Sequence, residues 1–205
     1  MAPLDLSPLG SNGSIAIPGL LTPENADSIA RRCDALLGND LDARPGDKSA
    51  SGTRRAADLQ DRIPEITGLF EDPALLGAVT HLLGQRVPLT DVAFRCPQPG
   101  FGEQSLHADD VPIQHAGECR AVTSIVTLCN FTEDNGATAV VPGSHRRPDM
   151  QRRLGRLDLS SGEVMLTGTA GTAFVFSAHI LHRGTRNRSS GPRPALQAQW
   201  RLRAM

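Results

Sequence analysis

The sequence is poor in aromatic residues, with six Phe, one Trp and no Tyr among its 205 residues. Sites that stack nucleobases or sugar rings are built from several aromatic side chains, so this composition argues against such a site. Basic residues are not in excess either, because the formal net charge is −1. A near-neutral chain without a polybasic run is not expected to bind nucleic acid or an anionic membrane surface.

Long hydrophobic runs and paired cysteines are also missing. No apolar run is long enough to cross a bilayer, and the first residues lack the basic start and apolar stretch of a signal peptide. The four cysteines, Cys33, Cys96, Cys119 and Cys129, show no paired spacing, which predicts reduced thiols rather than disulfides or a structural zinc site. These absences predict a cytoplasmic protein, and the length suits a single domain spanning residues 1–205.

The first part of the chain predicts a short strand at residues 14–18 and two helices. Thr22 is a suitable N-cap for the first helix, whose apolar residues recur at helical spacing up to Gly38. Asp72 is a suitable N-cap for the second helix, and Gly84 is expected to end it.

Residues 39–58, between the two helices, are polar and rich in turn-forming residues, and they predict a long loop. Such a loop is either a mobile surface connection or a lid over a substrate, since long loops in compact domains often bind ligands. In the second case, Arg54 and Arg55 would face an anionic substrate.

After residue 84 the pattern changes to short strands separated by turn residues. The predicted strands are residues 87–95, 104–109, 121–129, 138–141, 163–166, 172–176, 179–183 and 196–203. Many short strands with frequent turns indicate a sandwich or a barrel, and eight strands in two sheets form a jelly roll. We therefore predict a mainly β fold with flanking helices.

A histidine and a carboxylate stand two residues apart in the second of these strands. Side chains at positions i and i+2 leave the same face of a strand, so His107 and Asp109 can bind one metal ion from one side. His182 offers a second imidazole, and Arg193 follows it eleven residues later. Two histidines and one carboxylate form the facial ligand set of non-haem Fe(II) oxygenases, and arginine binds carboxylates with a planar fork. This combination suits an enzyme that uses iron and 2-oxoglutarate.

Other candidate ligands are less favoured by their positions. His179 is close to His182 in sequence, but the residues that follow His182 favour His182 as the third ligand. Asp110 is a second carboxylate, but strand alternation turns it to the opposite face. We expect His179 at the rim or surface, His115 on the surface and His145 in a structural turn.

Three segments of the chain carry recognisable motifs. They are F-T-E-D-N-G-A-T followed by V-V-P-G-S-H within residues 131–145, H-R-G-T-R-N-R-S at residues 182–189, and G-L-L-T-P-E at residues 19–24. Together, these motifs resemble those of the phytanoyl-CoA dioxygenase family. The resemblance extends over most of the chain, from about Ile15 to Arg203. It implies a double-stranded β-helix of the cupin-like jelly-roll type, with Fe(II), 2-oxoglutarate and O2 as cofactor and cosubstrates.

The resemblance also implies roles for residues around the metal. Arg193 is expected to bind the distal carboxylate of 2-oxoglutarate, and Gln104 the end that binds the metal, although strict strand alternation would turn Gln104 away. Where relatives often carry Trp, this chain has Ile125, and Thr127 is a candidate replacement contact. In related halogenases a small residue stands at the position of Asp109, so the carboxylate here implies oxygenation rather than halogenation.

These observations predict a dioxygenase that oxidises an unactivated C–H bond of a small molecule, with His107, Asp109 and His182 as the catalytic metal ligands. Hydroxylation is the expected outcome, and desaturation, epoxidation or cyclisation use the same first step. The Ala-, Arg- and Gly-rich composition is reminiscent of bacteria with GC-rich genomes, where such enzymes often act in natural-product biosynthesis. The alternatives are a cupin-type metalloenzyme that needs no cosubstrate and a non-catalytic jelly-roll binding protein.

Overall fold

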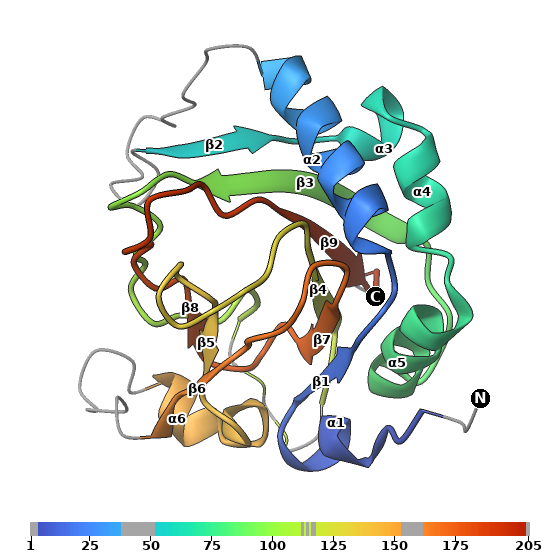
Figure 1. Cartoon of the computed structure of the whole chain (residues 1–205). Coiled ribbons are helices and arrows are strands. Elements are labelled where there is room, and N and C mark those ends of the chain that lie inside the picture. The colour runs from blue at the N-terminus through green and yellow to red at the C-terminus, as the bar shows by residue number, and fades with distance from the viewer. Residues whose placement is uncertain are drawn as a thin grey trace.

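The computed structural model describes residues 4–37, 52–111, 113, 115, 118–152 and 162–203. Two antiparallel sheets dominate it, with helices on the outer side of the larger sheet (Figure 1). The larger sheet has six strands in the order β1 (Ser14–Ile17), β7 (Ala173–Ser177), β4 (Ala121–Thr127), β9 (Ala195–Arg201), β3 (Leu89–Pro97) and β2 (Thr53–Ala56). The smaller sheet has three strands in the order β6 (Val164–Met165), β5 (Ala139–Val140) and β8 (His182–Arg183).

Both helices predicted from the sequence are confirmed, and their caps form as expected. The hydroxyl of Thr22 accepts a hydrogen bond from Asn25 N at the start of α2 (Pro23–Leu37). Asp72 accepts from the backbone of Ala74 and Leu75 at the start of α5 (Pro73–Leu83), and Gly84 ends α5 in the left-handed conformation with φ 71°. Gly38 lies outside the described residues. The remaining helical segments are α1 (Ser7–Ser11), α3 (Leu59–Arg62), α4 (Glu65–Leu69), η1 (Ser144–Arg146) and α6 (Pro148–Arg152).

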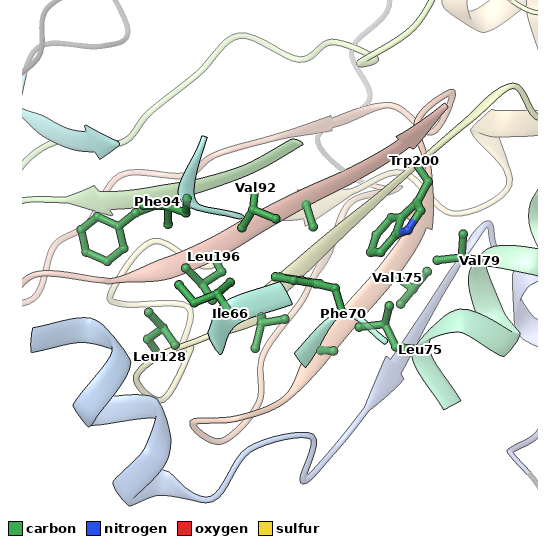
Figure 2. Close-up of a cluster of buried hydrophobic side chains, with 14 of the residues drawn as sticks. Ile66, Phe70, Leu75, Val79, Val92, Phe94, Leu128, Val175, Leu196 and Trp200 are labelled. Carbon is green, nitrogen blue, oxygen red and sulfur yellow. The ribbon is translucent and has the colours of Figure 1, made fainter. Parts of the chain in front are cut away.

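Strand alternation divides the larger sheet into a face that packs on the helices and a face that lines a cavity. On β9, Leu196, Ala198 and Trp200 are buried in the main hydrophobic core, which α2 to α5 cover (Figure 2). The ring of Trp200 meets that of Phe70 edge to face, with 6.0 Å between centroids. The residues between them on β9 turn the other way, and Gln197 lines the cavity. The helices therefore stabilise one face and leave the other for a site.

Two predictions about secondary structure are wrong. Residues 104–109 do not form a strand, since only His107 takes part in a single bridge, with His182. Residues 53–56, predicted to be loop, form β2 at the edge of the larger sheet. Residues 39–51 of that predicted loop lie outside the described residues. The predicted strand at 179–183 is reduced to β8, because residues 177–180 form a turn.

Among the residues that the structure describes, no helix combines the length and the apolar character needed to cross a membrane.

Candidate metal centre

Three side chains from separate parts of the sequence meet at one point. His107, Asp109 and His182 each offer one ligand atom, and these atoms lie within 4.8 Å of one another. Asp109 Oδ1 is 3.7 Å from His107 Nε2 and 3.5 Å from His182 Nε2. The two imidazole rings have their centroids 4.4 Å apart. In the described part of the chain this is the one group of three such ligand atoms that could hold a metal ion.

A backbone bridge, rather than a continuous strand, brings the two histidines together. His107 N donates to His182 O at 2.9 Å, and His182 N donates to His107 O at 2.8 Å. The next segment is held by Ala178 O, which accepts from Asp109 N at 2.9 Å. The two residues predicted to share one strand face therefore converge, although the segment that carries them bends away after the bridge.

Both imidazole rings are oriented so that the same nitrogen faces the metal position. His107 Nδ1 lies 2.8 Å from Ser105 O, and His182 Nδ1 lies 3.0 Å from Ile180 O. Because a carbonyl oxygen can only accept, each Nδ1 must carry the proton. Each Nε2 then has a lone pair directed toward Asp109, which is the tautomer that a metal ligand requires.

The electrostatics of Asp109 also suit a cation. Burial alone would raise the pKa of this carboxyl, but its contacts with His182, the Thr123 hydroxyl and His107 hold the pKa below its usual range. Thr123 Oγ1 donates to Asp109 Oδ2 at 2.7 Å, which leaves Oδ1 facing the histidines. Burial, followed by the charge of His182, lowers the pKa of His107. Two neutral imidazoles and one carboxylate fit a divalent first-row metal ion.

The three side chains open onto a cavity of about 280 Å³ between the two sheets. Its size is near the lower end of the range for small-molecule sites. The lining combines side chains of the larger sheet with residues of β8 and of the loops around it: Arg55, Arg95, Gln104, Ile125, Thr138, Phe176, Gly184, Arg193, Ala195 and Gln197, beside the three ligand residues.

Arg193 lies in this lining and is 6% exposed. Its guanidinium group stacks over the ring of Phe131, with the carbon Cζ 4.4 Å from the ring centroid. Burial is the main cause that lowers the pKa of Arg193, and the charge of Arg95 acts in the same direction. A buried guanidinium that faces a cavity is suited to bind a carboxylate in a fork geometry.

Gln104 reaches the cavity because its segment is not a strand. Its Oε1 accepts from Gly184 N at 2.9 Å, just after β8, so the carboxamide is fixed against the loop that follows His182. A side chain on Gly184 would not fit there, since a Cβ would lie 2.4 Å from Gly102 O and 2.8 Å from Gln104 Oε1. Strict alternation would have turned Gln104 away, and the irregular backbone removes that restriction.

The structure does not bring Thr127 to the cavity lining. Its hydroxyl donates to Thr169 O at 2.8 Å and accepts from Thr172 N at 3.1 Å, so it ties β4 to the turn before β7. Ile125, two residues earlier on the same face, lines the cavity instead. The sequence could place both residues on one face but could not show that the turn at Thr169 covers the second.

The other histidines and Asp110 lie outside the metal position, but two of them are more buried than expected. His179 is fully buried rather than at the surface, with Nε2 accepting from Arg120 N at 3.1 Å and Nδ1 donating to Val111 O at 3.1 Å. The carboxylate of Asp110 pairs with Arg201 at 2.8 Å and is 8% exposed. His145 is buried in η1, and His115 is exposed as predicted.

Thr123 and Arg95 were not identified from the sequence as part of this site. The hydrogen bond of Thr123 to Asp109 and the place of Arg95 in the lining reveal them. The only available signal for Thr123 was its position two residues before Ile125, on the predicted inward face of β4. Of the two arginines that the sequence placed beside a possible anionic substrate, Arg55 lines the cavity, whereas Arg54 forms an ion pair with Asp34 on α2 instead.

Comparisons with known proteins agree with this geometry. The profile of the phytanoyl-CoA dioxygenase (PhyH) family matches residues 9–195. An uncharacterized protein of Mycobacterium tuberculosis is 30% identical over 141 residues, which are 67% of this chain and 48% of the relative. This chain thus spans about half the length of that relative. The L-proline trans-4-hydroxylase of Streptomyces griseoviridis is 24% identical over 218 residues, covering 91% of this chain and 81% of the hydroxylase.

A solved structure shows the same fold. The epimerase SnoN, in complex with Fe3+, alpha ketoglutarate and nogalamycin RO, superposes with a TM-score of 0.78 at 18% identity, covering 96% of this chain and 81% of SnoN. The fold is therefore that of the double-stranded β-helix oxygenases, as predicted, and iron with 2-oxoglutarate is present in that structural relative. With the family profile matched over most of its length and a His-Asp-His triad in its cavity, the chain belongs to the phytanoyl-CoA dioxygenase family of Fe(II)- and 2-oxoglutarate-dependent oxygenases.

Proposed function

We propose that this chain is a dioxygenase that uses Fe(II) and 2-oxoglutarate to hydroxylate an unactivated C–H bond of a small molecule. Residues 1–205 would act as one oxygenase domain. The observation that carries the proposal is the convergence of His107 Nε2, Asp109 Oδ1 and His182 Nε2 in a cavity that also contains the buried Arg193.

His107, Asp109 and His182 would hold the iron. Hydrogen bonds from Nδ1 to Ser105 O and Ile180 O keep both imidazoles in the ligand tautomer, and Thr123 orients the carboxylate. Together, bound Fe(II) and 2-oxoglutarate reduce O2 with release of succinate and CO2, which makes one oxygen atom available for the substrate. The protein supplies the binding site, the orientation of the substrate and the exclusion of water.

Arg193 would bind the distal carboxylate of 2-oxoglutarate. Its burial strengthens a charge-assisted pair, because little water competes for the guanidinium hydrogen bonds. Gln104, fixed by Gly184 N, would direct its amide NH2 group toward the end of the cosubstrate that binds the metal. Ile125 and Phe176 supply apolar walls in the same lining.

The relatives support a small-molecule substrate from natural-product metabolism. One is named for hydroxylating L-proline, and SnoN is described as an epimerase from nogalamycin biosynthesis. The same site could also desaturate, epoxidise or cyclise its substrate, and analysis of the product distinguishes these reactions from hydroxylation.

The test is turnover with Fe(II), 2-oxoglutarate and O2 against a panel of small molecules, with succinate and the oxidised product both quantified. We expect succinate to form only when metal and cosubstrate are both present, and one substrate to raise its rate. Product formation without 2-oxoglutarate would show a cosubstrate-independent metalloenzyme instead. An unaltered 2-oxoglutarate pool in the presence of every metal tested, together with no detectable metal binding, would identify a non-catalytic binding protein.

A further inference from the structure

Among the residues that the structure describes, none pairs with the charge of Arg193. The side chain is 6% exposed, and burial lowers its pKa to about 10, so it still carries its charge at neutral pH. In the described part of the chain no hydrogen bond or ion pair joins its guanidinium group to an acceptor, and the buried Nε has no partner. Buried charges are normally paired, so the orientation of this side chain has another cause.

That cause is the ring of Phe131, which covers one face of the guanidinium group. The carbon Cζ of Arg193 lies over the ring, 4.4 Å from its centroid. The five N–H donors of a guanidinium group lie in its plane and point outward from its edges. A ring that binds the face therefore uses none of these donors, whereas a carboxylate or carbonyl partner would occupy some of them. The contact fixes the plane of the group and leaves its fork free for a ligand.

Both partners of this contact are themselves held in place. Phe131 is 2% exposed, its backbone forms a bridge with Gly168, and its side chain packs in a small buried cluster with Ala195. In the bridge, Phe131 N donates to Gly168 O at 2.8 Å, and Gly168 N donates to Phe131 O at 3.1 Å. The backbone of Arg193 is fixed by its N–H group, which donates to Pro97 O at 3.0 Å. Only the side-chain torsions of Arg193 are left to be restricted, and the ring restricts them.

We propose that Phe131 is a positioning residue, whose ring holds Arg193 in the orientation that receives the distal carboxylate of the cosubstrate. The inference rests on the proposed function, because it assigns Arg193 to 2-oxoglutarate. A flexible arginine loses rotamer freedom when it binds a ligand, and a side chain that is already held in place loses less. Phe131 therefore raises the affinity for 2-oxo acids that carry a distal carboxylate and not for those that lack one.

The test compares two ligands that differ at the distal end. One is 2-oxoglutarate, and the other is 2-oxopentanoate, in which a methyl group replaces the distal carboxylate. The protein is loaded with Mn(II), and paramagnetic relaxation of the ligand protons measures weak binding as well as tight binding. We expect Phe131→Leu to weaken the binding of 2-oxoglutarate roughly tenfold, as for the loss of a desolvated cation–π contact, and to leave 2-oxopentanoate as in the wild type. Equal weakening of both ligands would overturn the proposal.

The matched control for lost packing is Phe94→Leu. Phe94 is 1% exposed and lies in the main hydrophobic core beneath the helices (Figure 2), so its truncation removes a similar buried ring away from Arg193. Thermal unfolding should show that both variants are destabilised, and only Phe131→Leu should bind 2-oxoglutarate more weakly. If Phe94→Leu weakens 2-oxoglutarate to the same extent, a general loss of packing explains the effect and the proposal is wrong.

A second replacement keeps the shape of the ring. Pentafluorophenylalanine in place of Phe131 has nearly the same outline, but its ring face is electron-poor and no longer attracts a cation. We expect it to weaken 2-oxoglutarate about as much as Phe131→Leu does, and 4-fluorophenylalanine to give an intermediate effect. Wild-type affinity with the pentafluorinated ring would contradict the proposal, because packing alone would then hold Arg193.

The inference and the proposed function fail in different ways. Wild-type protein that binds no 2-oxoglutarate in the presence of Mn(II), or an Arg193→Gln variant that binds it as tightly as the wild type, would contradict the proposed function and the inference with it. Weaker binding in Arg193→Gln together with wild-type affinity in Phe131→Leu would contradict only the role of Phe131.

Discussion

The two sheets of this protein are built differently. The larger sheet has strands of up to nine residues, and its outer face packs into a continuous core beneath the helices. Each strand of the smaller sheet has two residues, so its ladder supplies few backbone hydrogen bonds. The loops around the smaller sheet are held by scattered backbone and side-chain hydrogen bonds, such as Val141 N to Leu181 O, Thr185 Oγ1 to Ala137 O and Leu181 N to Ser144 Oγ, all at 2.8 Å.

The difference separates stability from function. Regular pairing and apolar burial place most of the folding free energy in the larger sheet and its helices. Ligand residues lie where regular pairing gives way, at the bridge between His107 and His182. A site on irregular segments can direct Gln104 and His107 into one cavity, which a regular strand would not allow.

Asp109→Gly is expected to have the largest effect on activity while leaving the stability of the larger sheet unchanged. Removing a metal ligand loosens the ion, so activity with Fe(II) and 2-oxoglutarate should be lost, while the core of the larger sheet stays intact. Mass spectrometry of products formed in chloride buffer, together with thermal unfolding, measures both. In the wild type we expect an oxygenated, desaturated or cyclised product and no chlorination. A chlorinated product from the wild type, or full activity in Asp109→Gly, would show that Asp109 does not serve the metal.

Trp200→Ala should produce the opposite pattern. Trp200 is 1% exposed and packs against Phe70, so truncation should destabilise the fold by about 3–5 kcal/mol. Urea unfolding measures the change. The matched control is Val164→Ala on β6, because Val164 is 51% exposed and its loss should change the free energy of unfolding by less than about 0.5 kcal/mol. Similar decreases in the free energy of unfolding for the two variants would contradict the claim that the larger sheet supplies most of the stability.

Gly184→Ala tests how closely the loop after β8 is fitted. The new Cβ would lie 2.4 Å from Gly102 O and must displace that backbone and Gln104, at a cost of roughly 1–3 kcal/mol. We expect a larger KM for 2-oxoglutarate as Gln104 moves. Gly191→Ala, with no atom within 4 Å of its Cβ, is the control and should change neither stability nor KM. A normal KM in Gly184→Ala would mean that Gln104 does not position the cosubstrate.

The smallest effect is a pH dependence of stability that comes from His179. Burial, as the main cause, lowers the pKa of His179 below its ordinary value near 6.5. Since the unfolded chain then binds a proton that the folded chain does not, the free energy of unfolding should fall as pH decreases below about 6.5. Urea unfolding from pH 7.5 to 5.5 measures how steeply the free energy of unfolding falls with pH, and His179→Gln should make this dependence weaker. His115→Gln, at an exposed position, should leave it unchanged.

Much of the site could be predicted from the sequence, because its chemistry depends on residue types at fixed spacing. His107, Asp109 and His182 were identified this way and do converge, and Arg193 lies in the same cavity. The reason given for the convergence was only partly right, since a backbone bridge takes the place of the predicted strand. Sequence pattern cannot distinguish these cases, because both place the two side chains on one side of the backbone.

The features that were missed depend on contacts between distant segments. Alternation alone could not decide which of Arg54 and Arg55 faces the cavity, because that choice depends on where α2 and Asp34 lie. Burial of His179 likewise requires Val111 and Arg120 to fold around it. The helices with strong caps were predicted correctly, whereas α3 and α4 have no side-chain cap hydrogen bond and were not.

The central claim is that the three ligand residues and Arg193 form one site for iron and 2-oxoglutarate. Anaerobic titration of the Fe(II)-loaded protein with 2-oxoglutarate tests it directly, through the charge-transfer absorption of the chelate. We predict a saturable band in the wild type, no band in His182→Ala, and weaker 2-oxoglutarate binding in Arg193→Lys, by roughly 1–3 kcal/mol for one lost charge-assisted hydrogen bond. A wild-type band and affinity in both variants would contradict the claim.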